Sequence, residues 1–192
     1  PTLVRLREHV ELDHGVALVF DWTDAVSVGR QYEQRDRLDA LDTAARIDMV
    51  QQIYDFSAHV AALGWVAIDL YDGSVMVDPV TGRVVLCDLD VYRRAPAVND
   101  MGRMWGSTRF MSPEEYALGA TIDEVSTVVT LGALAHTFLG DDAGKAREAW
   151  SGGDERFRIA ARALEPDRHR RWPSIAALAQ AWRDAGPPDP RT

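Results

Sequence analysis

The chain has 192 residues, a formal net charge of −9 and a single cysteine, with 46% hydrophobic and 27% charged residues. This composition is ordinary for a globular protein with one substantial core, and its acidic balance argues against a nucleic-acid partner, which would require a basic face. A lone Cys87 cannot form an internal disulfide, which fits a reducing cytoplasm. No apolar run approaches the ~20 residues that cross a bilayer, so no membrane partner is expected.

The first half of the chain predicts a hairpin, a loop and a long helix. Two β-like runs, residues 3–12 and 15–22, are joined at the turn sequence Asp13-His14-Gly15. The chain begins at Pro1 directly in the first run, so we expect a fragment of a longer protein. Residues 23–40 predict a loop and a short helix. A helix is then expected from Asp42 or Thr43 to Gly64, because apolar residues repeat at steps of 4, 3, 4 and 3 at Met49, Ile53, Phe56, Val60 and Leu63.

After Gly64 the pattern predicts short strands and then helices. Residues 74–77 and 83–88 flank Asp78-Pro79-Val80-Thr81-Gly82, which suits a tight turn. Residues 91–120 show no sustained period and predict a long ordered loop. Thr121 to Glu124 resembles a capping box before a helix that ends at Gly140, and further helices are expected at 143–150, 154–164 and 174–185. The expected fold is mainly α with small β-hairpins, an α+β class.

Aspartates recur between Val66 and Asp90, among short β-branched runs. Asp69 and Asp88 are flanked by Ile68, Leu70, Leu86 and Cys87, and we expect both carboxylates to be buried. An unpaired buried carboxylate is unfavourable, so the pair predicts a role in binding a cation or a hydroxyl. Asp78 is instead expected to be a solvated turn residue.

Several segments together resemble the eukaryotic-like Ser/Thr protein kinase family, and the resemblance covers nearly the whole chain. Each segment alone is weak evidence, but the order and spacing of the set are specific. In chain order they are ALVFDWTDA (17–25), VAIDLYDGSVMVD (66–78), LCDLD (86–90), GSTRFMSPEE (106–115), TLGALAHTFLG (130–140) and PDRHRRWPS (166–174).

The resemblance implies a kinase large lobe at residues 23–187, preceded by a small-lobe remnant and hinge at 1–22 and followed by a tail at 188–192. It implies transfer of phosphate from ATP to Ser or Thr hydroxyls of a protein or peptide, which needs Mg²⁺ and a carboxylate that orients the acceptor. By position, Asp69 is the catalytic carboxylate and Asp88 the magnesium ligand. The other implied roles are magnesium binding by Ser74 and Asp90, adenine contacts by Phe20, Asp21, Trp22, Thr23 and Met76, an acceptor-site role for Ser107, and a structural ion pair between Glu114 and Arg171.

The chain also departs from the family pattern. Tyr71 stands where the family has a phosphate-contacting lysine, and Thr127 where it has an aspartate that anchors the catalytic loop. Asp90 replaces the glycine of the magnesium loop; Asp90 and Asp72 could be extra cation ligands or solvated side chains. Ala67-Ile68 replaces the His-Arg before the catalytic aspartate, which weakens any argument for a phosphorylation switch.

The family's glycine-rich loop and strand lysine have no counterpart, and the only lysine is Lys145. We therefore expect negligible phosphotransfer by this chain alone. A pseudokinase-type nucleotide-binding or scaffolding module is the first alternative. A small-molecule kinase of the aminoglycoside or choline type is the second, although FMSPEE at 110–115 favours a peptide site.

The remaining candidates predict structural roles. The five histidines are scattered without metal-ligand spacing, which argues against zinc. Cys87 predicts a small buried hydrophobe, and the tryptophans at 105, 150, 172 and 182 predict packing. Because the edges of the first hairpin would be unpaired, a homodimer through residues 1–20 is a further hypothesis.

Overall fold

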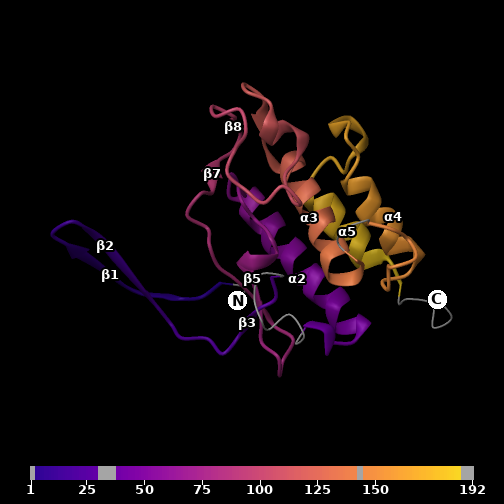
Figure 1. Ribbon diagram of the computed structural model, residues 1–192, viewed down its shortest axis with the longest axis horizontal. Coiled ribbons are helices and arrows are strands. Elements are labelled where there is room, and N and C mark those ends of the chain that lie inside the picture. Colours follow the sequence, from indigo (N-terminus) through magenta and orange to yellow (C-terminus); the bar gives the residue numbers. More distant parts are fainter. Residues whose placement is uncertain (1–2, 30–37, 142–144, 187–192) are drawn as a thin grey trace.

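The computed structural model describes residues 3–29, 38–141 and 145–186. Over these ranges the protein is an α+β fold in which four helices pack beside small antiparallel sheets (Figure 1). The fold class predicted from the sequence is confirmed at this level. The described helices are α2 (Thr43–Ala62), α3 (Glu124–Leu139), α4 (Asp154–Ala163) and α5 (Ile175–Asp184).

The described strands form four small antiparallel sheets. β1 (Leu6–Leu12) pairs with β2 (Gly15–Phe20), and β5 (Val75–Val77) lies between β3 (Val26–Ser27) and β6 (Val84–Leu86). β4 (Trp65–Val66) pairs with β7 (Arg93–Arg94), and β8 (Ala97–Val98) with β9 (Thr121–Ile122). There are also three single turns of 3₁₀ helix: η1 (Asp72–Ser74) between β4 and β5, η2 (Pro113–Tyr116) between β8 and β9, and η3 (Arg168–Arg170) between α4 and α5.

Helix α2 forms where the apolar period predicted it. Asp42 caps the helix, because its Oδ1 accepts a hydrogen bond from the backbone N–H of Ala45 at 2.8 Å. Met49 and Ile53 are fully buried, whereas Leu63, after the last turn, is exposed. The predicted core stripe is therefore correct for the first half of the helix and wrong at its end.

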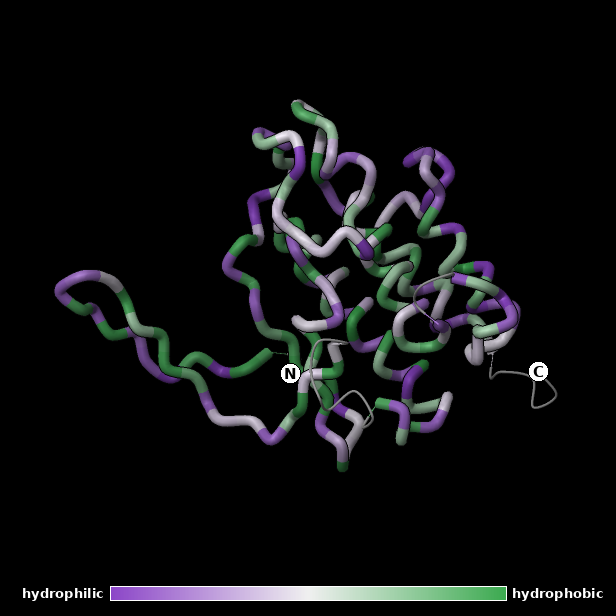
Figure 2. The backbone as a smooth tube through the Cα atoms, viewed as in Figure 1, coloured by the Kyte–Doolittle hydropathy of each residue, from purple (hydrophilic) through white to green (hydrophobic). Residues whose placement is uncertain are grey.

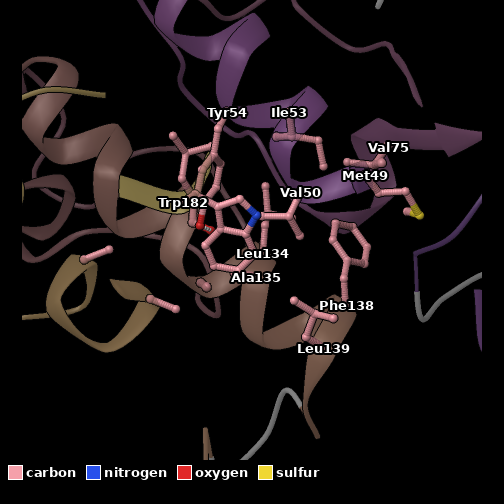
Figure 3. Packing of buried hydrophobic residues seen from close by; sticks show 14 of the residues in the cluster. Met49, Val50, Ile53, Tyr54, Val75, Leu134, Ala135, Phe138, Leu139 and Trp182 are labelled. Atoms are coloured by element: carbon pink, nitrogen blue, oxygen red, sulfur yellow. Dashed lines mark hydrogen bonds between the residues drawn. The ribbon is translucent and has the colours of Figure 1, made fainter. Parts of the chain in front are cut away.

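The core is centred where α2 meets α3, α5 and the β5–β6 hairpin (Figure 3). Tyr54 and Trp182 meet edge to face, with ring centroids 5.3 Å apart. Both polar tips reach backbone carbonyls: Tyr54 Oη donates to Leu131 at 3.2 Å, and Trp182 Nε1 donates to Ile47 at 3.3 Å. Buried aromatic side chains with satisfied polar atoms fix α2, α3 and α5 relative to one another.

The predicted loop at residues 91–120 is ordered around Asn99, whose side chain is fully buried. Its Oδ1 accepts from the backbone N–H groups of Met101 and Gly102, and its Nδ2 donates to the Glu114 carbonyl at 3.1 Å. Asn99 also exchanges backbone hydrogen bonds with residues 119–120. One amide side chain thus holds two stretches of the loop together, and short pairings β4–β7 and β8–β9 attach the loop to the body.

Two predictions about helices are wrong. Residues 145–150 are not helical: the backbone N–H of Trp150 donates to the Arg147 carbonyl at 3.1 Å, which closes a turn, and residues 142–144 lie outside the described ranges. The N-cap of α3 is Asp123, which accepts from Val125 N–H at 2.9 Å, while Thr121 pairs in β9. The helices predicted at 154–164 and 174–185 are present as α4 and α5. Residues 30–37 of the predicted 23–40 loop, and the predicted tail, lie outside the described part.

The β1–β2 hairpin projects from the helical body (Figure 1). Its strands pair with each other around the turn at residues 13–14, as predicted. The hairpin is anchored at its base, where Leu3 forms a parallel bridge with Leu86 of β6. In the part of the chain that the structure covers, no helix is long and apolar enough to span a membrane.

Candidate functional site

Asp69 lies in the loop between β4 and η1, and its backbone is in the left-handed region at φ 56°. The backbone N–H of Ser107 donates a hydrogen bond to its carboxylate. A Cβ on Gly106 would lie 3.6 Å from Asp69 Oδ1, so the 106–115 segment passes directly beside this carboxylate. The side chain is half-buried. Its position is therefore set by a strained backbone and a main-chain donor from a segment distant in sequence.

Asp88 follows β6 and also has left-handed backbone, at φ 62°. Its carboxyl group is hydrogen-bonded to the side chain of Asp90. Non-glycine residues in this conformation cost of order 1 kcal/mol or more and are enriched at functional sites. Within the described ranges, positive φ at a non-glycine residue occurs at Asp69, Asp88 and Lys145, so two of the three coincide with the aspartates singled out by the sequence.

The carboxylates of Asp69, Asp88 and Asp90 influence one another. Burial raises the pKa of Asp69 above its ordinary value; the Ser107 N–H opposes this shift, and the charge of Asp90 adds to it. Partial burial is the largest cause that raises the pKa of Asp88. Hydrogen bonding to Asp90, the charge of Asp90 and the charge of Asp69 raise it further. A cation would stabilise a site where the charge of Asp90 raises the pKa of both Asp69 and Asp88. The charge of Asp69 therefore reaches Asp88, although Asp69 is not among the residues that line the cavity beside Asp88.

The predicted burial of Asp88 is wrong. Its side chain is exposed at the edge of the site, and Asp90 is exposed as well. Leu86 ends the buried part of β6, and the left-handed turn at Asp88 directs the following residues outward. The argument from the cost of burial therefore applies only to Asp69, and then only in part.

A cavity of about 700 Å³ adjoins Asp88 and Asp90. Its walls come from the base of the β1–β2 hairpin on one side and from β5, β6 and residues 87–90 on the other. Phe20 and Met76, the predicted adenine contacts, both line it. The complete lining is Leu3, Val4, Leu6, Leu18, Phe20, Met76, Leu86, Cys87, Asp88, Leu89 and Asp90. An apolar cavity with carboxylates at one end has the size and character of a small-molecule site.

The predicted adenine-facing residues 21–23 lie elsewhere. Asp21, Trp22 and Thr23 line a second hollow of about 260 Å³, together with residues 3–5, Arg83 and Val85. Trp22 is 89% exposed, and the Asp21 carboxylate is ion-paired with Arg7. Phe20 and the three residues after it therefore line different hollows, which share Leu3 and Val4.

Ser74 is the described residue best placed to assist a cation beside Asp88. Its carbonyl accepts a hydrogen bond from Cys87 N–H at 3.0 Å, which brings Ser74 next to the residue before Asp88. The Ser74 hydroxyl is buried and makes no hydrogen bond within the described ranges. A buried hydroxyl without a partner is unfavourable, so Ser74 and Asp88 fit a hard, oxygen-seeking ion such as Mg²⁺.

The acidic residues do not form a complete protein cage for a metal. Among residues 3–29, 38–141 and 145–186, no group of three or more His, Cys, Asp or Glu side chains has metal-binding geometry. Mg²⁺ ordinarily takes only one or two carboxylates and completes its shell with phosphate oxygens and water. A magnesium ion at Asp88 would therefore need a phosphate-bearing ligand in the same site.

Asp72 is neither solvated nor available as a cation ligand, contrary to both sequence-based expectations. The side chain has no exposed surface, and its Oδ1 lies 2.9 Å from Nη2 of Arg109. The signal for this pair was weak: Arg109 is the only basic residue in the 106–115 segment, but nothing in the local pattern predicts its partner. Asp78 does behave as the predicted turn residue, because its Oδ1 accepts from the N–H groups of Val80 and Thr81.

Glu114 and Arg171 form the ion pair expected from the sequence. Nη1 of Arg171 lies 3.0 Å from Oε1 of Glu114, and the arginine side chain is completely buried. Its remaining donors reach the carbonyls of Glu165, Pro166 and Val125. The pair ties η2, beside the site, to the segment before α5.

The expectations for Cys87 and one tryptophan need correction. Cys87 is half-buried in the cavity wall, where burial and then the charge of Asp88 raise the pKa of its thiol. Trp150 and Trp182 pack in the core as predicted, and Trp172 is partly buried. Trp105 is 63% exposed, so the predicted packing is wrong for this residue.

Comparisons with known proteins do not assign the chain to a family. No model of a known protein family matches the chain. A search of curated proteins also gave no match.

Proposed function

We propose that this chain carries the large-lobe part of a protein-kinase-like phosphotransferase, whose complete form transfers phosphate from ATP to Ser or Thr hydroxyls of a protein or peptide. The observation that carries this proposal is the arrangement around Asp69. This half-buried carboxylate interacts with Asp88 and Asp90, and it accepts a hydrogen bond from Ser107 at the start of the 106–115 segment. An acceptor-orienting carboxylate beside a cation-binding one is what phosphoryl transfer requires.

The roles follow from where the side chains lie. Asp69 would orient the acceptor hydroxyl and take its proton as the new O–P bond forms and ADP leaves. Asp88 and Ser74 would hold Mg²⁺, with Asp90 assisting, and the ion would supply positive charge to offset that of the phosphates. Phe20 and Met76 line the apolar cavity, which would take the adenine. We place this activity in the cytoplasm.

The chain alone should show negligible transfer. None of the residues that line the cavity beside Asp88 is basic, so a triphosphate would meet carboxylates without a compensating cation from the protein. Electrostatic stabilisation of the transferring group is the main catalytic contribution in this chemistry. Binding of Mg²⁺-ATP is therefore the appropriate readout for this chain.

Isothermal titration calorimetry of ATP with Mg²⁺, and with EDTA in its place, tests the proposal. We expect Mg²⁺-dependent binding that weakens at least about tenfold in Asp88→Asn, one lost ligand being worth about 1.4 kcal/mol or more. Glu148→Gln is the matched control, because it removes one exposed carboxylate outside the site. Equal ATP binding by wild type and Asp88→Asn, or ATP binding that does not depend on Mg²⁺, would refute the assignment of Asp88 as a magnesium ligand.

A pseudokinase-type binding module is the second candidate. Two observations favour it: Tyr71 stands where the family has a phosphate-contacting lysine, and none of the residues that line the cavity beside Asp88 is basic. Nucleotide binding without phosphate transfer by the complete protein would support this candidate. The small-molecule kinase alternative is less favoured, because Asp69 contacts the segment whose sequence resembles a peptide site.

A further inference from the structure

The β1–β2 hairpin exposes apolar side chains along its whole length. Figure 2 shows hydrophobic residues on this projecting arm, far from the helical core. Leu12 and Leu18 are 57% and 51% exposed, and the other exposed apolar side chains of the two strands are Leu6, Val16, Val19 and Phe20. An isolated two-stranded hairpin is marginal in water. A second surface that covers these side chains would stabilise the hairpin.

β1 also has an open edge. It pairs with β2 on one side only, and in the described part of the chain no strand is hydrogen-bonded to its other side over Leu6–Leu12. An open edge of this length is a template for pairing with a further strand. The question is which strand fits it.

The charge pattern of β1 answers this question. The strand and its flanks read Arg5-Leu6-Arg7-Glu8-His9-Val10-Glu11-Leu12-Asp13. Two basic residues separated by leucine precede the centre, and two acidic residues separated by leucine follow it. Reversing the strand about His9 puts each arginine opposite an acidic residue and each leucine opposite a leucine.

A second copy of the same strand, run antiparallel, supplies that reversal. With His9 on the two-fold axis, Arg7, which lies at a β-bulge, comes opposite Glu11 of the other copy, and Arg5 and Asp13, which flank the two ends of the strand, come close to each other. Leu6 faces Leu12. By symmetry each contact occurs twice, as in any isologous interface, and opposite charges directly across antiparallel strands are stabilising.

We propose that two copies of this chain associate through antiparallel pairing of β1 with β1, forming a four-stranded sheet in the order β2-β1-β1-β2. The side chains that form the cross-strand pairs are available, because Arg5, Arg7, Glu11 and Asp13 are all exposed. Arg7 is already ion-paired with Asp21 through Nε, and its remaining guanidinium donors are able to reach a second carboxylate.

The association affects the cavity as well as the hairpin. Leu6, Leu18 and Phe20 form one wall of the 700 Å³ cavity, and they belong to the strands that the second copy would hold in place. The proposal does not depend on the nucleotide assignment, since it rests on the hairpin alone.

Charge reversal tests the pairing. One variant, Arg5→Glu with Arg7→Glu, has only acidic residues at the four positions. The other, Glu11→Arg with Asp13→Arg, has only basic ones. Sedimentation equilibrium should show a wild-type dimer that weakens as salt rises, and each variant alone should raise the dimer dissociation constant roughly tenfold or more.

Mixing the two variants provides the decisive control. In a mixed pair every one of the four contacts is again between opposite charges, so a heterodimer should form, detected by native mass spectrometry with one variant isotopically labelled. A variant that fails to fold cannot give this result, and the Glu11/Asp13 variant leaves the Arg7–Asp21 pair intact. A wild type that stays monomeric at about 100 μM, or equal dimerisation by all variants, would overturn the proposal and leave the hairpin to another partner.

Discussion

Oδ1 of Asp72 lies 2.9 Å from Nη2 of Arg109, so a carboxylate without exposed surface is neutralised by a residue 37 positions away. Asp72 begins η1, three residues after Asp69, and Arg109 lies two residues after Ser107. The pair therefore fixes the loop that carries Asp69 against the segment whose N–H groups contact it. The ion pair thereby holds together the two segments that form the candidate site, the loop with Asp69 and the 106–115 segment.

Removing the cation of this pair should destabilise the protein strongly. Arg109→Met leaves the Asp72 carboxylate buried without its guanidinium partner. We expect the free energy of unfolding to fall by about 3 kcal/mol, the lower end of the range for a broken buried pair, because Arg109 is one-third exposed. Urea unfolding measures the loss. Arg158→Met is the control: its pair with Glu155 is exposed on both sides, so the change should stay below about 0.5 kcal/mol. Similar losses in both variants would show that the Asp72 pair has no special role.

Arg171 makes a second buried pair, with a different expected response to substitution. Arg171→Met leaves Glu114 and the carbonyls of Glu165 and Pro166 without their hydrogen-bond donor. The substitution should lower the free energy of unfolding by about 3–5 kcal/mol. Glu114→Gln keeps an acceptor for Arg171 and should cost less. Chemical denaturation of the two variants checks the order; a larger loss for Glu114→Gln would contradict it.

The start of α3 gives a test of the corrected cap. Asp123 accepts from Val125 N–H and is ion-paired with Arg168. Asp123→Ala should lower the free energy of unfolding by about 1 kcal/mol or slightly more. Asp123→Asn keeps a capping oxygen and should lower it less. Thr121→Ala should be nearly neutral, because Thr121 lies in β9 and does not cap the helix. Thermal unfolding of the three variants separates the two caps, and a dominant effect of Thr121→Ala would restore the cap predicted from the sequence.

Much of the fold was predictable because its signals are local. The period of Met49 and Ile53, the Ser174 cap before α5, and the Pro79–Gly82 turn each act over a few residues. The predicted helix at 143–150, which is absent over residues 145–150, shows the limit of such signals. There the backbone N–H of Trp150 donates to the Arg147 carbonyl and closes a turn, and the Arg147 side chain donates to the Trp150 carbonyl, a contact that residue preferences alone do not reveal.

The site was less predictable because it depends on contacts between distant segments. The sequence singled out Asp69 and Asp88, but the exposure of Asp88 depends on where β6 ends and the chain turns. The burial of Asp72 depends on Arg109, and the different hollows faced by Phe20 and Trp22 depend on the direction of the projecting hairpin. None of these is encoded within a short window.

The raised pKa of Asp88 predicts how stability changes with pH. In the folded protein, burial and the neighbouring carboxylates of Asp90 and Asp69 disfavour its charged form. Between the unfolded value of ~3.9 and the higher folded value, the native state binds more protons than the unfolded state. Stability from this group is therefore present at low pH and is lost as pH rises through the folded pKa.

Asp88→Asn should accordingly be more stable than wild type at neutral pH, and the gain should vanish on acidification below about pH 4. Asparagine tolerates the left-handed backbone at this position, so the substitution isolates the charge. Asp100→Asn is the matched control of opposite sign, because Arg93 lowers the pKa of Asp100; its variant should lose stability at neutral pH, and that loss should disappear as acid protonates Asp100. Urea unfolding at several pH values measures both. Parallel profiles for the two variants would mean that the carboxylates around Asp88 do not repel one another in the folded protein.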